Sequence, residues 1–166
     1  MATMQLTRPL LIALAVLAVP VAYLGYQRYL KTDPPGPYDR RADAQADLGR
    51  AVDQARRENK RVLVVFGANW CPDCRELATD MANPALGIPI AARFVVTKVD
   101  VGHFDRNGRT VTRMGNPVDK GIPAVVVLDG QGQQLGTATG PQLAAVRKAR
   151  DPATLVAALD RLAAPQ

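Results

Sequence analysis

The chain has 166 residues, with 48% hydrophobic and 22% charged side chains, so we expect one folded domain with short additions rather than a disordered or fibrous protein. Its two cysteines and single histidine exclude a disulfide-rich miniprotein, a four-cysteine zinc module and a His-rich metal site. The net charge of +6 comes from Lys and Arg scattered along the chain, and only 5% of residues are aromatic, which argues against nucleic-acid binding.

The N-terminal segment, residues 1–31, predicts a membrane-targeting element. Residues 10–27 carry no charge, and the apolar run has a length between a signal-peptide core and a full membrane-spanning helix. Cleavage after Ala18 would leave Pro20 as the second residue of the mature chain and would shorten the apolar run. We therefore favour an uncleaved signal anchor that contacts the membrane through residues 10–27, with a cleaved signal peptide as the alternative.

A proline-rich stretch at residues 32–38 separates this segment from the rest and predicts a stiff, extended linker. The folded domain is then expected over residues 39–166. Its first element is a helix within 40–59, where Ala44, Leu48 and other apolar residues recur at helical spacing.

Apolar runs predict the strands that follow, and amphipathic or proline-opened stretches predict the helices. The predicted strands are 62–66, 94–101, 124–128 and a weak edge strand at 133–138, and the predicted helices are 72–81, 84–92 and 152–162. The run 62–66 is continuously apolar, which is typical of a strand covered on both faces. This order of elements predicts a small α/β fold with a mixed sheet.

The only two cysteines, Cys71 and Cys74, lie three residues apart, directly after the buried strand and at the start of a helix. A thiol at a helix N-terminus lies at the positive end of the helix dipole, which favours its thiolate. Cys71 is therefore the expected nucleophile and Cys74 the resolving thiol of a redox pair. Half of a zinc site and a purely structural disulfide stay open as alternatives, although so short a loop would stabilise the fold weakly.

The segment from Phe66 to Cys74 and the segment Gly121-Ile122-Pro123-Ala124 together resemble the thioredoxin family, and the resemblance extends over about residues 39–164. It implies a thioredoxin-like fold, with a mixed central sheet and helices on both faces, here preceded by an N-terminal anchor helix. It also implies dithiol–disulfide exchange, with Pro123 in a cis bond to Ile122 beside the substrate chain. Within the family, the sequence resembles the anchored, exported thioredoxin-like proteins.

The sequence departs from the family pattern in two places. Typical thioredoxins carry a buried acid where this chain has Val65, so Lys98 lacks the partner that the family would give it. Within the motif, Pro72 and Asp73 replace the usual glycine and proline. Asp73 suits the first turn of a helix, and it also disfavours a thiolate at Cys71 and so makes the disulfide less oxidising.

Two neighbouring features are expected to act on the site only indirectly. Trp70 is expected to pack as a lid beside the disulfide. The connection at residues 102–120 is longer than usual for the family and leaves the carboxyl end of a strand, so it is placed to overhang Cys71 and select partners, or else to be a plain surface loop. Its His103 is expected to be a surface or loop-stabilising residue rather than a proton shuttle.

We predict a thiol–disulfide oxidoreductase, acting as a reductant, with no cofactor beyond the Cys71–Cys74 disulfide and no metal. Its substrates would be cysteines of exported proteins or of a partner oxidoreductase, and a second redox partner would recycle it. The alternative is an assembly or binding factor that handles a protein or copper, for which Met81 and Met114 are the available soft ligands.

Location is predicted from conflicting signals. The resemblance and the signal-like run favour a domain on the exported, periplasmic side. The basic residues that follow the apolar run, including Arg28 and Lys31, favour the cytoplasmic side by the positive-inside rule. We expect the exported side, with secretion after cleavage or a cytoplasm-facing domain as alternatives.

Overall fold

The computed structural model describes residues 19–21, 23–24, 34–148 and 151–164. The chain divides into two units, 1–33 and 34–166. The predicted anchor at 10–27 lies largely outside the described residues, of which 19–21 and 23–24 have helical backbone. Within the described ranges, every helix is too short or too polar to cross a membrane. The boundaries predicted for the anchor, linker and domain stay a prediction.

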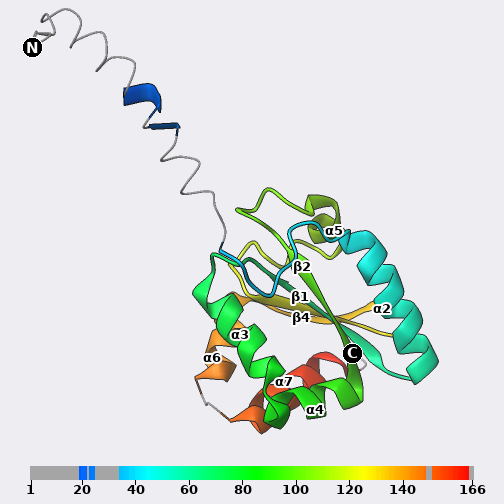
Figure 1. Ribbon diagram of the computed structural model, residues 1–166. Coiled ribbons are helices and arrows are strands. Elements are labelled where there is room, and N and C mark those ends of the chain that lie inside the picture. The colour runs from blue at the N-terminus through cyan, green and yellow to red at the C-terminus, as the bar shows by residue number, and fades with distance from the viewer. Residues whose placement is uncertain (1–18, 22, 25–33, 149–150, 165–166) are drawn as a thin grey trace, which may run out of the picture. The chain divides into compact units, whose positions relative to one another are not determined.

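The second unit is built around a four-stranded mixed sheet in the order β2-β1-β3-β4 (Figure 1). The strands are β1 Arg61–Gly67, β2 Phe94–Asp100, β3 Ala124–Leu128 and β4 Gln134–Ala138. β1 pairs in parallel with β2 and antiparallel with β3, which pairs antiparallel with β4. The mixed sheet expected from the sequence is confirmed, and β4 lies at its edge as predicted.

Helices cover both faces of this sheet (Figure 1). They are α2 Ala44–Glu58, α3 Pro72–Ala82, α4 Pro84–Arg93, α5 Gly108–Arg113, α6 Gly140–Arg147 and α7 Pro152–Leu162. α2 and α5 contribute to the core on one face, and α3, α4, α6 and α7 contribute to the core on the other. β1 is buried on both faces, which explains its continuous apolar sequence.

Two of these helices were not expected. In α5, glycine and β-branched residues give a low helix propensity, and the helix exists because Val111 and the following Met114 bury their side chains in the α2 core. α6 begins with a signal that could have been recognised. Gln142 accepts a hydrogen bond from the backbone N–H of Thr139 at 2.8 Å, and Pro141 stands in the first turn.

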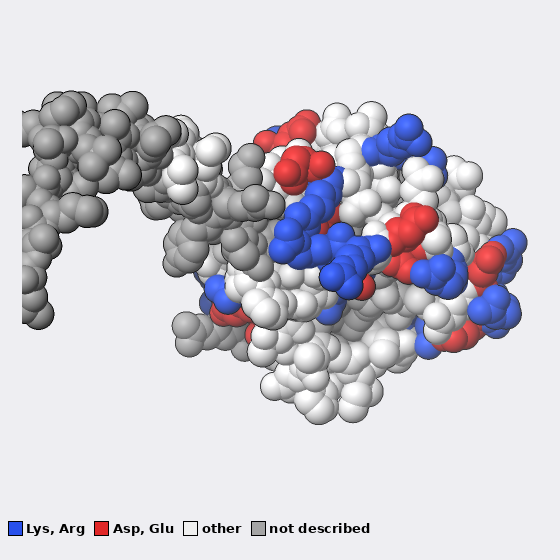
Figure 2. Space-filling model, turned by 45° about the horizontal axis from the view of Figure 1, so that its top comes forward, with Lys and Arg blue, Asp and Glu red and all other residues white. Residues whose placement is uncertain are grey.

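Charged side chains of both signs are interspersed on the face shown in Figure 2, and uncharged side chains cover a broad part of it. Several Lys and Arg side chains touch one another near the centre of this view, with Asp or Glu side chains on either side of them. Acidic side chains therefore partly offset the positive charge on this face.

Candidate functional site

The two cysteines form a disulfide at the start of α3, with their Cα atoms 5.3 Å apart. β1 ends at Gly67, a short turn follows, and Cys71 is the N-cap of the helix with Pro72 in its first turn. The Cys71 sulfur accepts a hydrogen bond from the backbone N–H of Cys74 at 3.2 Å. Because free N–H groups and the positive end of the dipole meet there, this position stabilises negative charge on Cys71.

The two sulfur-bearing residues differ in access. Cys71 is 4% exposed and Cys74 is fully buried. A thiol that attacks another protein must be reached from outside, so the difference suits Cys71 for the attack and Cys74 for an internal second step. The assignment of these roles stays a prediction.

The segment before β3 lies beside the disulfide. The Ile122–Pro123 peptide bond is cis, as expected from the sequence. The carbonyl oxygen of Ile122 lies 3.7 Å from the Cys71 sulfur, within van der Waals reach. Register explains the proximity, because Ala124 pairs with Phe66 near the end of β1, just before the turn to α3. Ile122 and Pro123 are therefore brought to the site, and their part in the reaction stays a prediction.

Trp70 joins the disulfide to the connection after β2. Its indole N–H donates a hydrogen bond to the carbonyl oxygen of Gly102 at 2.7 Å. The His103 ring stacks on the indole with centroids 5.3 Å apart, and Phe104 meets it edge-on at 6.1 Å. The expectation that His103 stabilises the loop fits this stack. This connection contains α5 and contacts the Trp70 side chain, so it is more than a plain solvated loop.

Tyr38 and Asn69 belong to the site although the sequence did not single them out. The Asn69 side chain accepts from the backbone N–H of Tyr38 at 2.9 Å and donates to its carbonyl oxygen at 2.8 Å. Tyr38 is 1% exposed and packs with Cys71 and Cys74 in one small cluster. Neither residue carries a sequence signal, because the contact joins positions 31 residues apart.

Lys98 lies opposite Val65 in the parallel register of β1 and β2. Val65 is buried in the core on the α3 face, and partial burial lowers the pKa of Lys98.

Asp73 is exposed in the first turn of α3. Its carbonyl oxygen accepts from Arg147, whose guanidinium also pairs with the carboxylates of Glu76 at 2.9 Å and Asp80 at 3.2 Å. Arg147 thus ties α6 to α3, a link that the sequence did not indicate.

The two methionines considered as copper ligands lie apart. Met114 is buried in the core on the α2 face, whereas Met81 packs against the core on the opposite face of the sheet. They therefore cannot bind one ion together, which agrees with the expectation that neither methionine has an obvious partner. Among the described residues, no group of three His, Cys, Asp or Glu side chains is placed to hold a metal.

A thioredoxin-like family profile matches residues 43–130, more than half of the sequence. The chain belongs to the thioredoxin-like family. With its CxxC disulfide, this thioredoxin-like protein is an enzyme, a thiol–disulfide oxidoreductase. The matched range contains both cysteines, the Ile122–Pro123 segment and the first three strands.

Solved structures include several similar chains. A disulphide isomerase from Xylella fastidiosa Temecula1 is 40% identical, and the match covers 76% of this chain and 98% of that one with a TM-score of 0.70. A mutant thioredoxin from Halobacterium salinarum NRC-1 is 25% identical over 67% of this chain and 81% of that one, with a TM-score of 0.42. A thioredoxin from Thermus thermophilus is 25% identical over 61% and 80%, with a TM-score of 0.45. No match was found among curated protein sequences.

Proposed function

We propose that this oxidoreductase acts as a disulfide reductant, with Cys71 as the attacking thiol and Cys74 as the resolving thiol. The observation that carries the roles of the two cysteines is the position of Cys71 at the N-cap of α3, where its sulfur receives the Cys74 N–H. The reducing direction rests on Asp73 instead, because a stabilised thiolate by itself makes a disulfide more oxidising. An extended substrate chain would lie along Ile122 and Pro123, since the Ile122 carbonyl borders the Cys71 sulfur and proline offers no N–H of its own.

The reaction takes two exchanges. The Cys71 thiolate attacks one sulfur of the substrate disulfide, a mixed disulfide forms, and the other substrate sulfur leaves as a thiolate that takes a proton from water. The Cys74 thiolate then attacks the Cys71 sulfur and the first substrate sulfur leaves. The substrate disulfide has gained two electrons, and the enzyme ends as the Cys71–Cys74 disulfide.

Asp73 supports the reducing direction. Its carboxylate stands in the first turn of α3, within the loop that holds the thiolate, and a negative charge there disfavours the reduced, ionised form of Cys71. A less stable thiolate corresponds to a less oxidising disulfide. The similar structure described as a disulphide isomerase makes disulfide isomerisation a second candidate function.

Two assays separate these functions. We expect the full-length protein, kept soluble in detergent, to accelerate dithiothreitol-driven reduction of insulin, and the Cys71→Ser variant to be inactive. Recovery of activity from scrambled ribonuclease measures isomerisation. A protein that restores ribonuclease efficiently but leaves insulin oxidised would overturn the reductant proposal in favour of an isomerase.

We further propose that the domain lies on the exported side of a membrane, held by residues 10–27, and acts on the cysteines of exported proteins or of a partner oxidoreductase. The uncharged run and the resemblance to exported proteins support this location, whereas the basic residues after the run oppose it. Alkaline phosphatase fused after Gln166 should be active if the proposal is right. An inactive fusion, with an active cytoplasmic reporter at the same site, would place the domain in the cytoplasm.

A further inference from the structure

Two buried polar atoms have no hydrogen-bond partner among the described residues, the hydroxyl oxygen of Tyr38 and the Oδ1 atom of Asp100. Leaving a buried polar group unpaired costs about 1–3 kcal/mol, so most such groups in folded proteins find a partner. Two of them at one place in a small domain therefore require an explanation.

The hydroxyl and the carboxylate lie together. The Tyr38 hydroxyl occupies the space that a Cβ atom at Gly67 would fill. Gly67 pairs with Asp100 in the parallel register of β1 and β2, and paired positions of neighbouring strands project to the same face of a sheet. Burial first, and the charge of Asp100 second, raise the pKa of Tyr38. The hydroxyl and the carboxylate thus lie near each other in the buried interior, without a hydrogen bond between them.

This space lies on the same face of the sheet as the resolving cysteine. Leu63 and Val65 belong to the core that α3 covers, and Gly67 continues their side of β1. The Tyr38 side chain packs with Cys71 and Cys74. Tyr38 therefore reaches from the disulfide to Gly67, which pairs with Asp100 at the end of β2.

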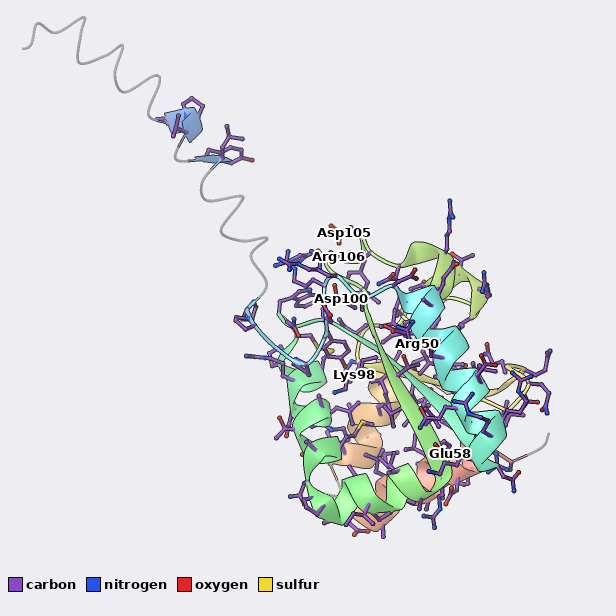
Figure 3. All side chains as sticks on the ribbon, turned by 45° about the vertical axis from the view of Figure 1, so that its right-hand side comes forward. Arg50, Glu58, Lys98, Asp100, Asp105 and Arg106 are labelled. Carbon is purple, nitrogen blue, oxygen red and sulfur yellow. A yellow bond between two sulfur atoms is a disulfide. The ribbon has the colours of Figure 1, made fainter. Side chains whose placement is uncertain are left out.

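Asp100 is held in place by the loop that follows β2. Its Oδ2 atom accepts from the Arg106 guanidinium at 2.6 Å, and its backbone carbonyl oxygen accepts from the Asn107 side chain at 2.7 Å. Its side chain is 1% exposed. Figure 3 shows Asp100 on β2 between Lys98 and Arg106, with Asp105 beyond Arg106. One carboxylate oxygen is thus occupied, and Oδ1 is left without a hydrogen-bond partner among the described residues.

The second exchange needs a group that accepts the proton of Cys74. Cys74 is fully buried, so its proton cannot pass directly to bulk water when the thiolate forms. We propose that Asp100 accepts the proton of Cys74 during the resolving step, by way of the Tyr38 hydroxyl or a water molecule bound to it. This inference rests on the proposed function, because it concerns the second exchange of the reductant cycle.

The proposed step conserves protons and electrons. The Cys74 S–H bond breaks and its proton moves to Asp100, while the sulfur electron pair forms the bond to Cys71. The bond between Cys71 and the substrate sulfur breaks, and the substrate leaves as a thiolate. Asp100 afterwards returns the proton to solvent, so the cycle needs no further reactant.

The experiment measures the two exchanges separately. The reduced full-length protein in detergent is mixed with one equivalent of the chromogenic disulfide dithiobis-nitrobenzoate in a stopped-flow instrument. Attack by Cys71 releases the first nitrothiobenzoate, and resolution by Cys74 releases the second. We expect Asp100→Asn to slow the second phase by about a hundredfold, the lower end of what a positioned proton acceptor contributes, with the first phase unchanged. Tyr38→Phe should slow the same phase to a smaller extent.

The pH profile separates a proton acceptor from a structural role. Without Asp100, hydroxide must take the proton, so the second-phase rate of Asp100→Asn should rise in proportion to hydroxide concentration, and that of the wild type less steeply. The charged and titratable groups around Asp100 are Arg106, Lys98, Tyr38 and Asp105. Asp119→Asn removes an exposed carboxylate from the same connection, away from these groups, and should leave both phases unchanged.

Three outcomes would overturn the proposal that Asp100 accepts the proton. A second phase that keeps its wild-type rate in Asp100→Asn shows that the carboxylate takes no proton. A phase that slows with an unchanged pH profile shows a purely structural role. Slowing in Lys98→Gln but not in Asp100→Asn assigns the proton to Lys98. Loss of the first phase in the wild type would instead contradict the proposed function itself.

Discussion

The backbone N–H of Cys74 lies 3.2 Å from the Cys71 sulfur and donates to it. The same peptide segment therefore carries the buried thiol and stabilises a charge on the outer one. This relationship makes the two cysteines unequal, although they are equivalent members of the motif in the sequence.

Because the two cysteines are unequal, substituting each of them should have a different effect. Cys71→Ser should abolish disulfide reduction, because no thiolate remains at the helix N-terminus. Cys74→Ser should accumulate mixed disulfides, because the first exchange proceeds and the second cannot. Thiol alkylation of the reduced wild type followed by mass spectrometry gives a direct check. Faster alkylation of Cys74 than of Cys71 would reverse the assignment of roles.

Asp73 should tune the redox potential. Its charge lies within the active-site loop, where repulsion of a nearby thiolate is on the order of 1 kcal/mol. Asp73→Asn should therefore lower the pKa of Cys71 and make the disulfide more oxidising by roughly 10–30 mV. Equilibration of both proteins with glutathione measures the shift. Asp119→Asn, an exposed acid outside the motif, is the control, and an unchanged potential in Asp73→Asn would leave Asp73 as a helix-terminus residue only.

Lys98 should make stability depend on pH. Partial burial lowers its pKa in the folded protein. Between this lowered pKa and the ordinary lysine value near 10.4, the unfolded chain binds more protons than the folded one, so the free energy of unfolding rises with pH. Lys98→Met keeps an apolar stem without the charge, so it should be more stable than the wild type at neutral pH, and its advantage should shrink as the pH rises.

Urea unfolding of both proteins from neutral to alkaline pH checks this prediction. Lys120→Met serves as the control, since Lys120 is exposed and its substitution should leave the pH dependence unchanged. A stability difference between Lys98→Met and the wild type that is constant with pH would show that the charge of Lys98 is not involved.

Asn69 should contribute strongly to stability and activity. It is 2% exposed and makes two hydrogen bonds to the backbone of Tyr38. Asn69→Ala leaves both backbone groups without a partner, so we expect a loss of about 2 kcal/mol in the free energy of unfolding. Insulin reduction should also fall, because the turn that carries Cys71 loses its attachment to Tyr38.

The matched control is Asn83→Ala. Asn83 is exposed and caps α4 by accepting from the backbone N–H of Ala85. Its loss should cost about 1 kcal/mol and leave the reductase activity unchanged. Equal losses of activity in the two variants would show that the Asn69 contact has no particular connection to the site.

The sequence determined most of the elements and the reactive pair. β1 was recognisable because a strand buried on both faces is continuously apolar, and α3 because a proline follows Cys71 directly after that strand. The CxxC spacing likewise needs no tertiary contact, since residues three apart at a helix start lie close together. These signals are local, so the sequence alone is enough to recognise them.

Only the tertiary structure decided what surrounds the pair. Tyr38 closes over Gly67 at the end of β1, Asp100 arrives beside it through the register of β2, and Arg147 reaches α3 from α6. α5 forms because its Val111 fits the core, against its own propensity. Each of these contacts joins residues far apart in the chain, and their energy comes from burial and pairing that exist only once the sheet and its helices have packed.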